Sequence, residues 1–130
     1  SKSTSFSSSK SILKQKTNIY WLLGGIPKKK DKFDLEKKYL GKIRAFIYGK
    51  NKAFFNLELK NKIKIENFKN LKDALKKVFI IIKKHKLIEQ TILFSPSAAS
   101  FDSFKNFEER GRYFNRLIKK YLNGSKKNNI

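Results

Sequence analysis

Three short segments of the chain carry residue types that could hold a small anionic substrate. The longest is SPSAASFDSFKNFEERG, Ser95 to Gly111, in which small residues and hydroxyls stop at Asp102 and an amphipathic pattern follows. Small residues contribute little burial to a packed element, so this pattern indicates backbone shaped to approach a ligand closely. A helix that starts just after Asp102 would point its first N–H groups at this loop, where the helix field favours an anion.

The other two segments are shorter and offer a cation and further hydroxyls. LLGGIPK places Lys28 shortly after Gly24-Gly25, and SKSTS opens the chain at residues 1–5. Lys28 belongs to a run of three lysines, and a solvent-exposed lysine is the commoner role for such a residue. Residue type alone therefore leaves ligand contact and solvation both open at Lys28.

Strand and helix patterns alternate along the chain and must position these segments. Apolar β-prone runs predict strands at residues 17–23, 42–49, 62–66 and 90–95. Helix patterns start at Asp34, Asn51 and Asn70, the last with Asp73 placed for a near capping box. The alternation predicts an α/β fold, a Rossmann-like, mostly parallel sheet with helices on both faces. Ligands of such sheets bind beyond the carboxyl ends of the strands, so the three segments should share one edge.

The two ends of the chain differ from its centre in their patterns. A final helix at about 103–122 has an apolar stripe that should pack on the sheet, formed by Phe104, Phe107, Gly111, Phe114, Ile118 and Tyr121. Residues 1–124 are predicted to form one domain, followed by a frayed polar tail at 125–130. The opening serines fit either a linker or a helix that buries Phe6 and Leu13. In an isolated fragment we expect residues 1–16 to be disordered.

Composition narrows the class of protein. The net charge is +22, but the cations are 28 Lys and only 4 Arg, which favours solvated lysine faces over a nucleic-acid interface. No cysteine is present, which excludes a disulfide framework and a cysteine metal site. No apolar run is longer than that of Val78 to Ile82, which is far shorter than a membrane span. We expect a soluble intracellular domain and, because the chain has no methionine, a piece of a longer product.

The three segments, in this order, resemble the C-terminal domain of the Mur ligase family, in the branch that adds D-glutamate to UDP-N-acetylmuramoyl-L-alanine during bacterial peptidoglycan synthesis. SKSTS is similar to the family's Asn-Asp-Ser-Lys-Ala-Thr-Asn from just after the Asp, with Ser3 for Ala and Ser5 for Asn. LLGGIPK resembles Leu-Gly-Gly followed shortly by Lys. The third segment resembles Ser-Pro-Ala-X-Ala-Ser-X-Asp-X-Phe-X-X-Phe-X-X-Arg-Gly almost residue for residue. The resemblance extends from Ser1 to about Leu122.

This resemblance implies one domain of an ATP-dependent amide ligase that works through an acyl phosphate. The partners it implies are D-glutamate, ATP, UDP-N-acetylmuramoyl-L-alanine, and the central and N-terminal domains of the same chain, with no nucleic acid and no membrane. The family's P-loop and Mg²⁺ ligands lie in the preceding central domain, and no Gly-X-X-X-X-Gly-Lys-[Ser/Thr] occurs here. We therefore expect no catalytic residue and no metal site in this chain, no activity from it alone, and a monomeric enzyme of the bacterial cytoplasm.

The family's binding positions carry over to five residues. Thr4, Lys28, Ser100 and Phe107 match the positions that hold D-glutamate, and Lys2 matches one beside the nucleotide and reacting phosphate. Besides Lys28, two of them have a competing interpretation. Phe107 lies on the apolar stripe, so its ring suits the core while its N–H suits a carboxylate. Ser100 could simply support the turn ahead of the next helix.

Two alternatives to this function remain open. A folylpolyglutamate synthase-like ligase also adds glutamate, but we match no segment like Ser95 to Asp102 to it. A basic nucleic-acid-binding α/β module would fit the charge alone, and its binding would weaken steeply with salt.

Overall fold

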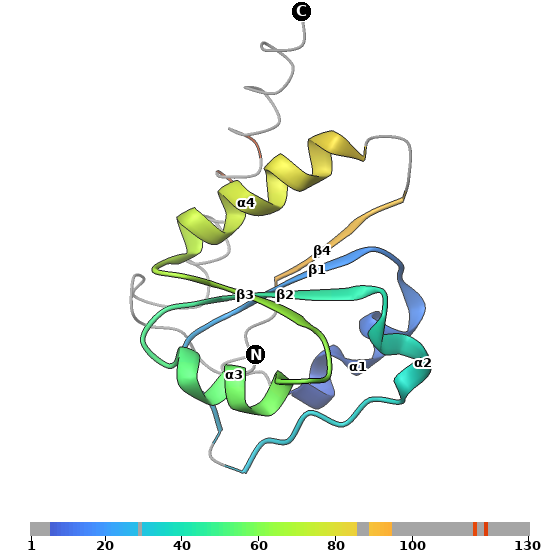
Figure 1. The fold of residues 1–130 in the computed structure, drawn as a ribbon, viewed down its shortest axis with the longest axis vertical. Coiled ribbons are helices and arrows are strands. Elements are labelled where there is room, and N and C mark those ends of the chain that lie inside the picture. Colours follow the sequence, from blue (N-terminus) through green and yellow to red (C-terminus); the bar gives the residue numbers. More distant parts are fainter. Residues whose placement is uncertain (1–5, 29, 86–88, 95–115, 117–118, 120–130) are drawn as a thin grey trace, which may run out of the picture.

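A four-stranded, all-parallel sheet forms the centre of the molecule in a computed structural model, which describes residues 6–28, 30–85 and 89–94 together with Arg116 and Lys119 (Figure 1). The strands, in the order β3-β2-β1-β4, are β1 Ile19–Leu23, β2 Ile43–Tyr48, β3 Lys64–Phe68 and β4 Thr91–Phe94. The helices are α1 Phe6–Gln15, α2 Lys37–Leu40, α3 Lys52–Leu59 and α4 Leu71–Lys84. The predicted Rossmann-like α/β class is confirmed.

The burial of each strand follows from its place in the sheet. All five residues of β1 are buried, and β2 is buried at every position except Arg44. Both strands lie inside the sheet and are covered on both faces, which explains their continuous apolar runs. β3 lies at the edge and has no buried residue. It begins at Lys64, two residues later than the predicted strand at 62–66.

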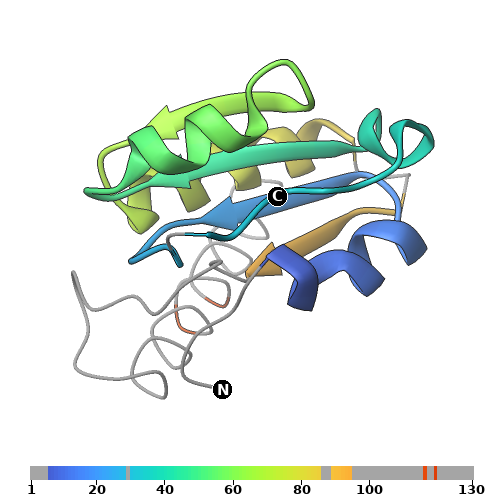
Figure 2. The same ribbon diagram turned by 90° about the horizontal axis from the view of Figure 1, so that it is seen from below.

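Helices cover both faces of the sheet (Figure 2). α1 and α3 pack on one face against alternate residues of β1 and β2, where Trp21, Phe55 and Leu13 are fully buried. α4 packs on the other face, where Phe46 and Leu75 are fully buried. Because successive strand residues point to opposite faces, β1 and β2 supply both halves of the core.

The opening segment forms a helix, α1, and not a linker. Phe6 is 3% exposed and Leu13 is fully buried, so α1 is packed on the sheet. The Phe6 ring makes edge contacts with Trp21, Phe33 and Phe55, at centroid distances of 5.9, 5.7 and 6.3 Å. The expectation of disorder is therefore wrong for residues 6–15, because the apolar surface that α1 buries offsets the entropy of ordering it.

The predicted helix starts hold for two helices and fail for one. The N–H of Asp73 donates to Oδ1 of Asn70 at 2.9 Å, so the predicted cap of α4 is confirmed. α3 also begins after Asn51, as predicted. α2 begins at Lys37, not at Asp34, because buried Phe33 holds the chain extended.

Two residues of the helix predicted at 103–122 lie within the part of the chain that the structure describes. Arg116 and Lys119 are helical, and the rest of the helix predicted at 103–122 lies outside the described residues. Among the described helices, none is both long enough and apolar enough to cross a membrane.

Candidate functional site

The turn after β1 is shaped by two glycines that are needed for different reasons. Gly25 has φ of 91°, a left-handed conformation that favours glycine. Gly24 lies against the buried Tyr48 ring, and a Cβ added at Gly24 would stand 2.4 Å from Cε2 of that ring. The Leu-Gly-Gly motif is therefore a close approach followed by a turn, at the edge where the parallel strands end. We call this edge the carboxyl edge.

Gly24→Ala is expected to destabilise the fold because the buried Tyr48 ring, 5% exposed, would have to shift to make room for the added Cβ. Overpacking of this kind costs roughly 1–3 kcal/mol. Gly41→Ala is the matched control, since a Cβ there meets nothing within 4 Å and φ is −66°. Thermal unfolding of both variants tests the prediction, and equal melting temperatures would contradict it.

Lys28 follows this turn and is exposed at the carboxyl edge. Its carbonyl oxygen accepts the N–H of Asp31 at 3.0 Å, which closes a short turn. Oδ2 of Asp31 in turn accepts the backbone N–H of Phe6, the first residue of α1, at 3.0 Å. The loop that carries Lys28 is thus tied to the start of α1, directly after the SKSTS segment.

A second side chain holds the other end of the loop. Nδ2 of Asn51, at the start of α3, donates to the carbonyl oxygen of Gly25 at 2.9 Å. Nζ of Lys52, the first residue of α3, donates to the carbonyl oxygen of Phe68 at 3.2 Å and joins the segment that follows β2 to the end of β3. The carboxyl edge is therefore built from several strand ends that are hydrogen-bonded to one another.

Of the five predicted site residues, Lys28 is the one within the described ranges. Lys2, Thr4, Ser100 and Phe107 lie outside the described residues and stay predictions. Two contacts were not predicted from the sequence. They are the hydrogen bond of Asn51 to Gly25 and that of Asp31 to the start of α1. The sequence indicated Asn51 only as a helix start. No pattern around Asp31 indicated that its partner is Phe6, which lies 25 residues away.

The described residues do not offer a ready metal site. Within ranges 6–28, 30–85 and 89–94, no three His, Cys, Asp or Glu side chains gather in a way that could hold a metal ion. The described part of the carboxyl edge offers a cation and glycine backbone, which suits an anion rather than Mg²⁺.

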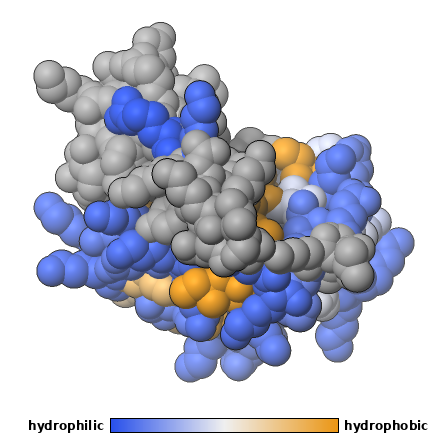
Figure 3. All heavy atoms as spheres, turned by 90° about the horizontal axis from the view of Figure 1, so that it is seen from above, coloured by the Kyte–Doolittle hydropathy of each residue, from blue (hydrophilic) through white to orange (hydrophobic). Residues whose placement is uncertain are grey.

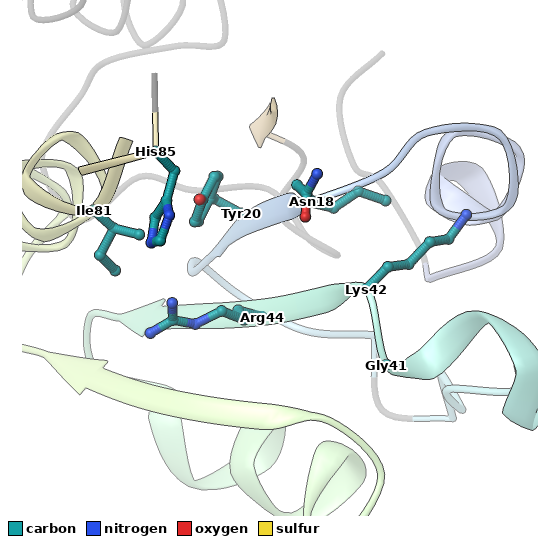
Figure 4. Close-up of a pocket in the computed structure, with 8 residues that line it drawn as sticks. Asn18, Tyr20, Gly41, Lys42, Arg44, Ile81 and His85 are labelled. Carbon is teal, nitrogen blue, oxygen red and sulfur yellow. The ribbon is translucent and has the colours of Figure 1, made fainter. Parts of the chain in front are cut away.

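A cavity of about 200 Å³ opens at the opposite edge, where β1 and β2 begin (Figure 4). Arg44 and His85 point into it, whereas Lys42 turns away and donates from Nζ to the carbonyl oxygen of Lys14 at 2.7 Å. Tyr20 also lines the cavity, and its hydroxyl donates to Oε1 of Gln90. Burial raises the pKa of Tyr20, and nearby Arg44 opposes this by favouring the phenolate. This cavity is separate from the predicted ligand edge.

The raised pKa of Tyr20 predicts loss of stability in alkaline solution. An unfolded tyrosine ionises near pH ~10, and the folded protein binds this proton more tightly. The stabilisation is complete below that pH and is lost as the pH rises through the raised pKa. Urea unfolding from about pH 8 to about pH 11 should show a weaker decline for Tyr20→Phe than for the parent chain. Identical declines would contradict the prediction.

The lysines of the chain lie on its surface. No lysine within the described ranges is buried, and the coloured part of the surface in Figure 3 is mostly hydrophilic with smaller hydrophobic patches. The prediction of solvated lysine faces agrees with this distribution.

The sheet and its glycine turn define a Rossmann-like α/β domain with a candidate anion site at the carboxyl edge. No family model matches the chain. It is 38% identical over 120 residues to a UDP-N-acetylmuramoylalanine–D-glutamate ligase of Wolbachia sp. subsp. Brugia malayi, covering 92% of this chain and 24% of the relative. The ligase of the same name from Rickettsia prowazekii is 41% identical over 126 residues, covering 93% and 27%. That of Hydrogenobaculum sp. is 39% identical over 125 residues, covering 95% and 29%.

These matches confirm the resemblance drawn from the motifs. The chain is homologous to one segment of the D-glutamate-adding Mur ligases, and the extent of the match is consistent with the C-terminal domain of such an enzyme. The chain spans about a quarter of the length of the curated relatives it matches.

Proposed function

We propose that this chain is the D-glutamate-binding, C-terminal domain of an ATP-dependent ligase that joins D-glutamate to UDP-N-acetylmuramoyl-L-alanine. The observation that carries the proposal is the match of over nine-tenths of the chain to ligases of that name. The described geometry supports it, because Lys28 lies on a loop anchored at both ends at the carboxyl edge of a parallel sheet.

The proposed roles follow from the chemistry of D-glutamate, which has two carboxylates and a nucleophilic amine. Lys28 neutralises one carboxylate, while the hydroxyls of Thr4 and Ser100 and the backbone N–H of Phe107 donate hydrogen bonds. Lys2 lies on the nucleotide side. Held in this way, the uncharged amine attacks the carbonyl carbon of the acyl phosphate. The C–N bond forms, the C–O bond to phosphate breaks, and the amine loses a proton.

ATP and Mg²⁺ take part in the proposed reaction, and this domain contributes Lys2 beside the nucleotide. ATP supplies the phosphoryl group that activates the acceptor carboxylate, and the metal neutralises charge on the phosphates. We assign both mainly to a central domain of the full-length protein, because the resemblance places the P-loop and the Mg²⁺ ligands there. The enzyme is proposed to be a monomer of the bacterial cytoplasm.

Product formation by the full-length protein tests the proposal. With ATP, Mg²⁺ and UDP-N-acetylmuramoyl-L-alanine present, labelled D-glutamate should enter the nucleotide-linked product, with one phosphate released per amide formed. L-glutamate is the control and should not be incorporated. Absence of product, or transfer of glutamate to a folate acceptor, would contradict the proposal. Salt-sensitive binding to RNA or DNA in place of ligation would indicate the basic nucleic-acid module.

A further inference from the structure

Asn51 stands at the start of a helix but does not cap it. Its side chain makes no capping hydrogen bond to α3 and instead reaches Gly25 on the neighbouring loop. We propose that Asn51 is a positioning residue for the incoming amino acid, acting through Gly25 on Lys28. The inference rests on the proposed function, because Lys28 must contact the substrate for its position to matter.

Asn70 caps its helix with its side chain, whereas Asn51 does not. Each of the two asparagines directly precedes a helix that packs on the sheet. Asn70 has extended backbone, φ −148° and ψ 171°, and accepts the N–H of Asp73 as a cap does. Asn51 has φ −103° and ψ 28° and leaves α3 without side-chain capping. The stabilisation that a cap provides is therefore replaced by a contact across the carboxyl edge.

That contact holds a residue with more conformational freedom than any other type. Gly25 is buried with φ of 91°, and glycine crosses easily between left- and right-handed conformations. Nδ2 of Asn51 fixes the direction of the Gly25 carbonyl group at 2.9 Å. Loss of this donor would remove the hydrogen bond that fixes the Gly25 carbonyl, and glycine itself sets no barrier of its own to a change of φ.

Lys28 is bracketed by this contact and a second one. Pro27 fixes its own φ and limits Ile26, so the path from Gly25 to Lys28 is short and stiff. Beyond Lys28, the N–H of Asp31 donates to the Lys28 carbonyl oxygen, and the Asp31 carboxylate holds the start of α1. The direction of the Lys28 side chain therefore depends on the Asn51 contact at one end of the loop.

Steady-state kinetics of the full-length ligase test the inference, with D-glutamate varied and the other substrates saturating. Asn51→Ala should raise the KM for D-glutamate about five- to thirtyfold, with the KM for ATP unchanged. Asn51→Ser should behave alike although its hydroxyl can cap α3, because serine is too short to reach Gly25. Asn70→Ala, the matched control, should lower the melting temperature and leave the KM for D-glutamate unchanged.

A double-mutant cycle separates positioning from a general structural role. If Asn51 acts through Lys28, Asn51→Ala should add little to the KM in a Lys28→Ala background. Full additivity would overturn the inference, as would Asn51 variants that behave like Asn70→Ala. Absence of ligation by the parent protein would instead overturn the proposed function, so the two failures are distinguishable.

Discussion

Lys28→Ala is expected to raise the KM for D-glutamate about ten- to a hundredfold in the full-length enzyme. A charge-assisted contact to a carboxylate contributes ~1.5–3 kcal/mol, which corresponds to this change in affinity. The KM values for ATP and for UDP-N-acetylmuramoyl-L-alanine should change little, because Lys28 is assigned to the amino acid alone.

Lys30→Ala is the matched control for this prediction. Lys30 belongs to the same lysine run and is exposed in the same loop, but it does not match a binding position of the ligases. Its replacement should leave all three KM values near those of the parent enzyme. An equal effect from both variants would show that only the local charge matters. A change confined to ATP or the nucleotide sugar in Lys28→Ala would contradict the role assigned to Lys28.

Phe6→Ala is expected to cause a large loss of stability. The Phe6 ring is 3% exposed and contacts three other aromatic rings, so its removal leaves a cavity beneath α1. Replacing a buried phenylalanine by alanine costs roughly 3–5 kcal/mol. Urea unfolding of the parent and variant chains measures the difference.

Ile12→Ala serves as the comparison on the same helix. Ile12 is 37% exposed, so its replacement should cost well under half as much as that of Phe6. Similar losses for both variants would mean that α1 is not anchored by Phe6.

Because SKSTS directly precedes Phe6, the Phe6 variant should also weaken D-glutamate binding through Thr4.

The parts of this fold that could be predicted from the sequence are those set by local pattern. β1 could be recognised because a strand covered on both faces needs a continuous apolar run. The cap of α4 could be recognised because its donor lies three residues from Asn70. The binding role of Lys28 was assigned through resemblance, since a lysine in a run carries no distinguishing signal of its own.

The parts that could not be predicted depend on contacts distant in sequence. Asp34 looked like a helix start, but burial of Phe33 and the hydrogen bond from its N–H to Oε1 of Glu58 keep this segment extended. The contacts of Asn51 with Gly25 and of Asp31 with Phe6 cross between elements that only the sheet brings together. Single-sequence patterns contain no information on such pairs.

Hydrogen exchange of the full-length ligase tests most directly whether D-glutamate binds at the carboxyl edge. The enzyme should be compared with and without D-glutamate, in the presence of UDP-N-acetylmuramoyl-L-alanine and a non-hydrolysable ATP analogue, with L-glutamate as the control. We predict that D-glutamate slows exchange in the peptide that covers residues 24–31 and that L-glutamate does not. Unchanged exchange there, with slowing instead around the opposite-edge cavity at Arg44 and His85, would contradict the account.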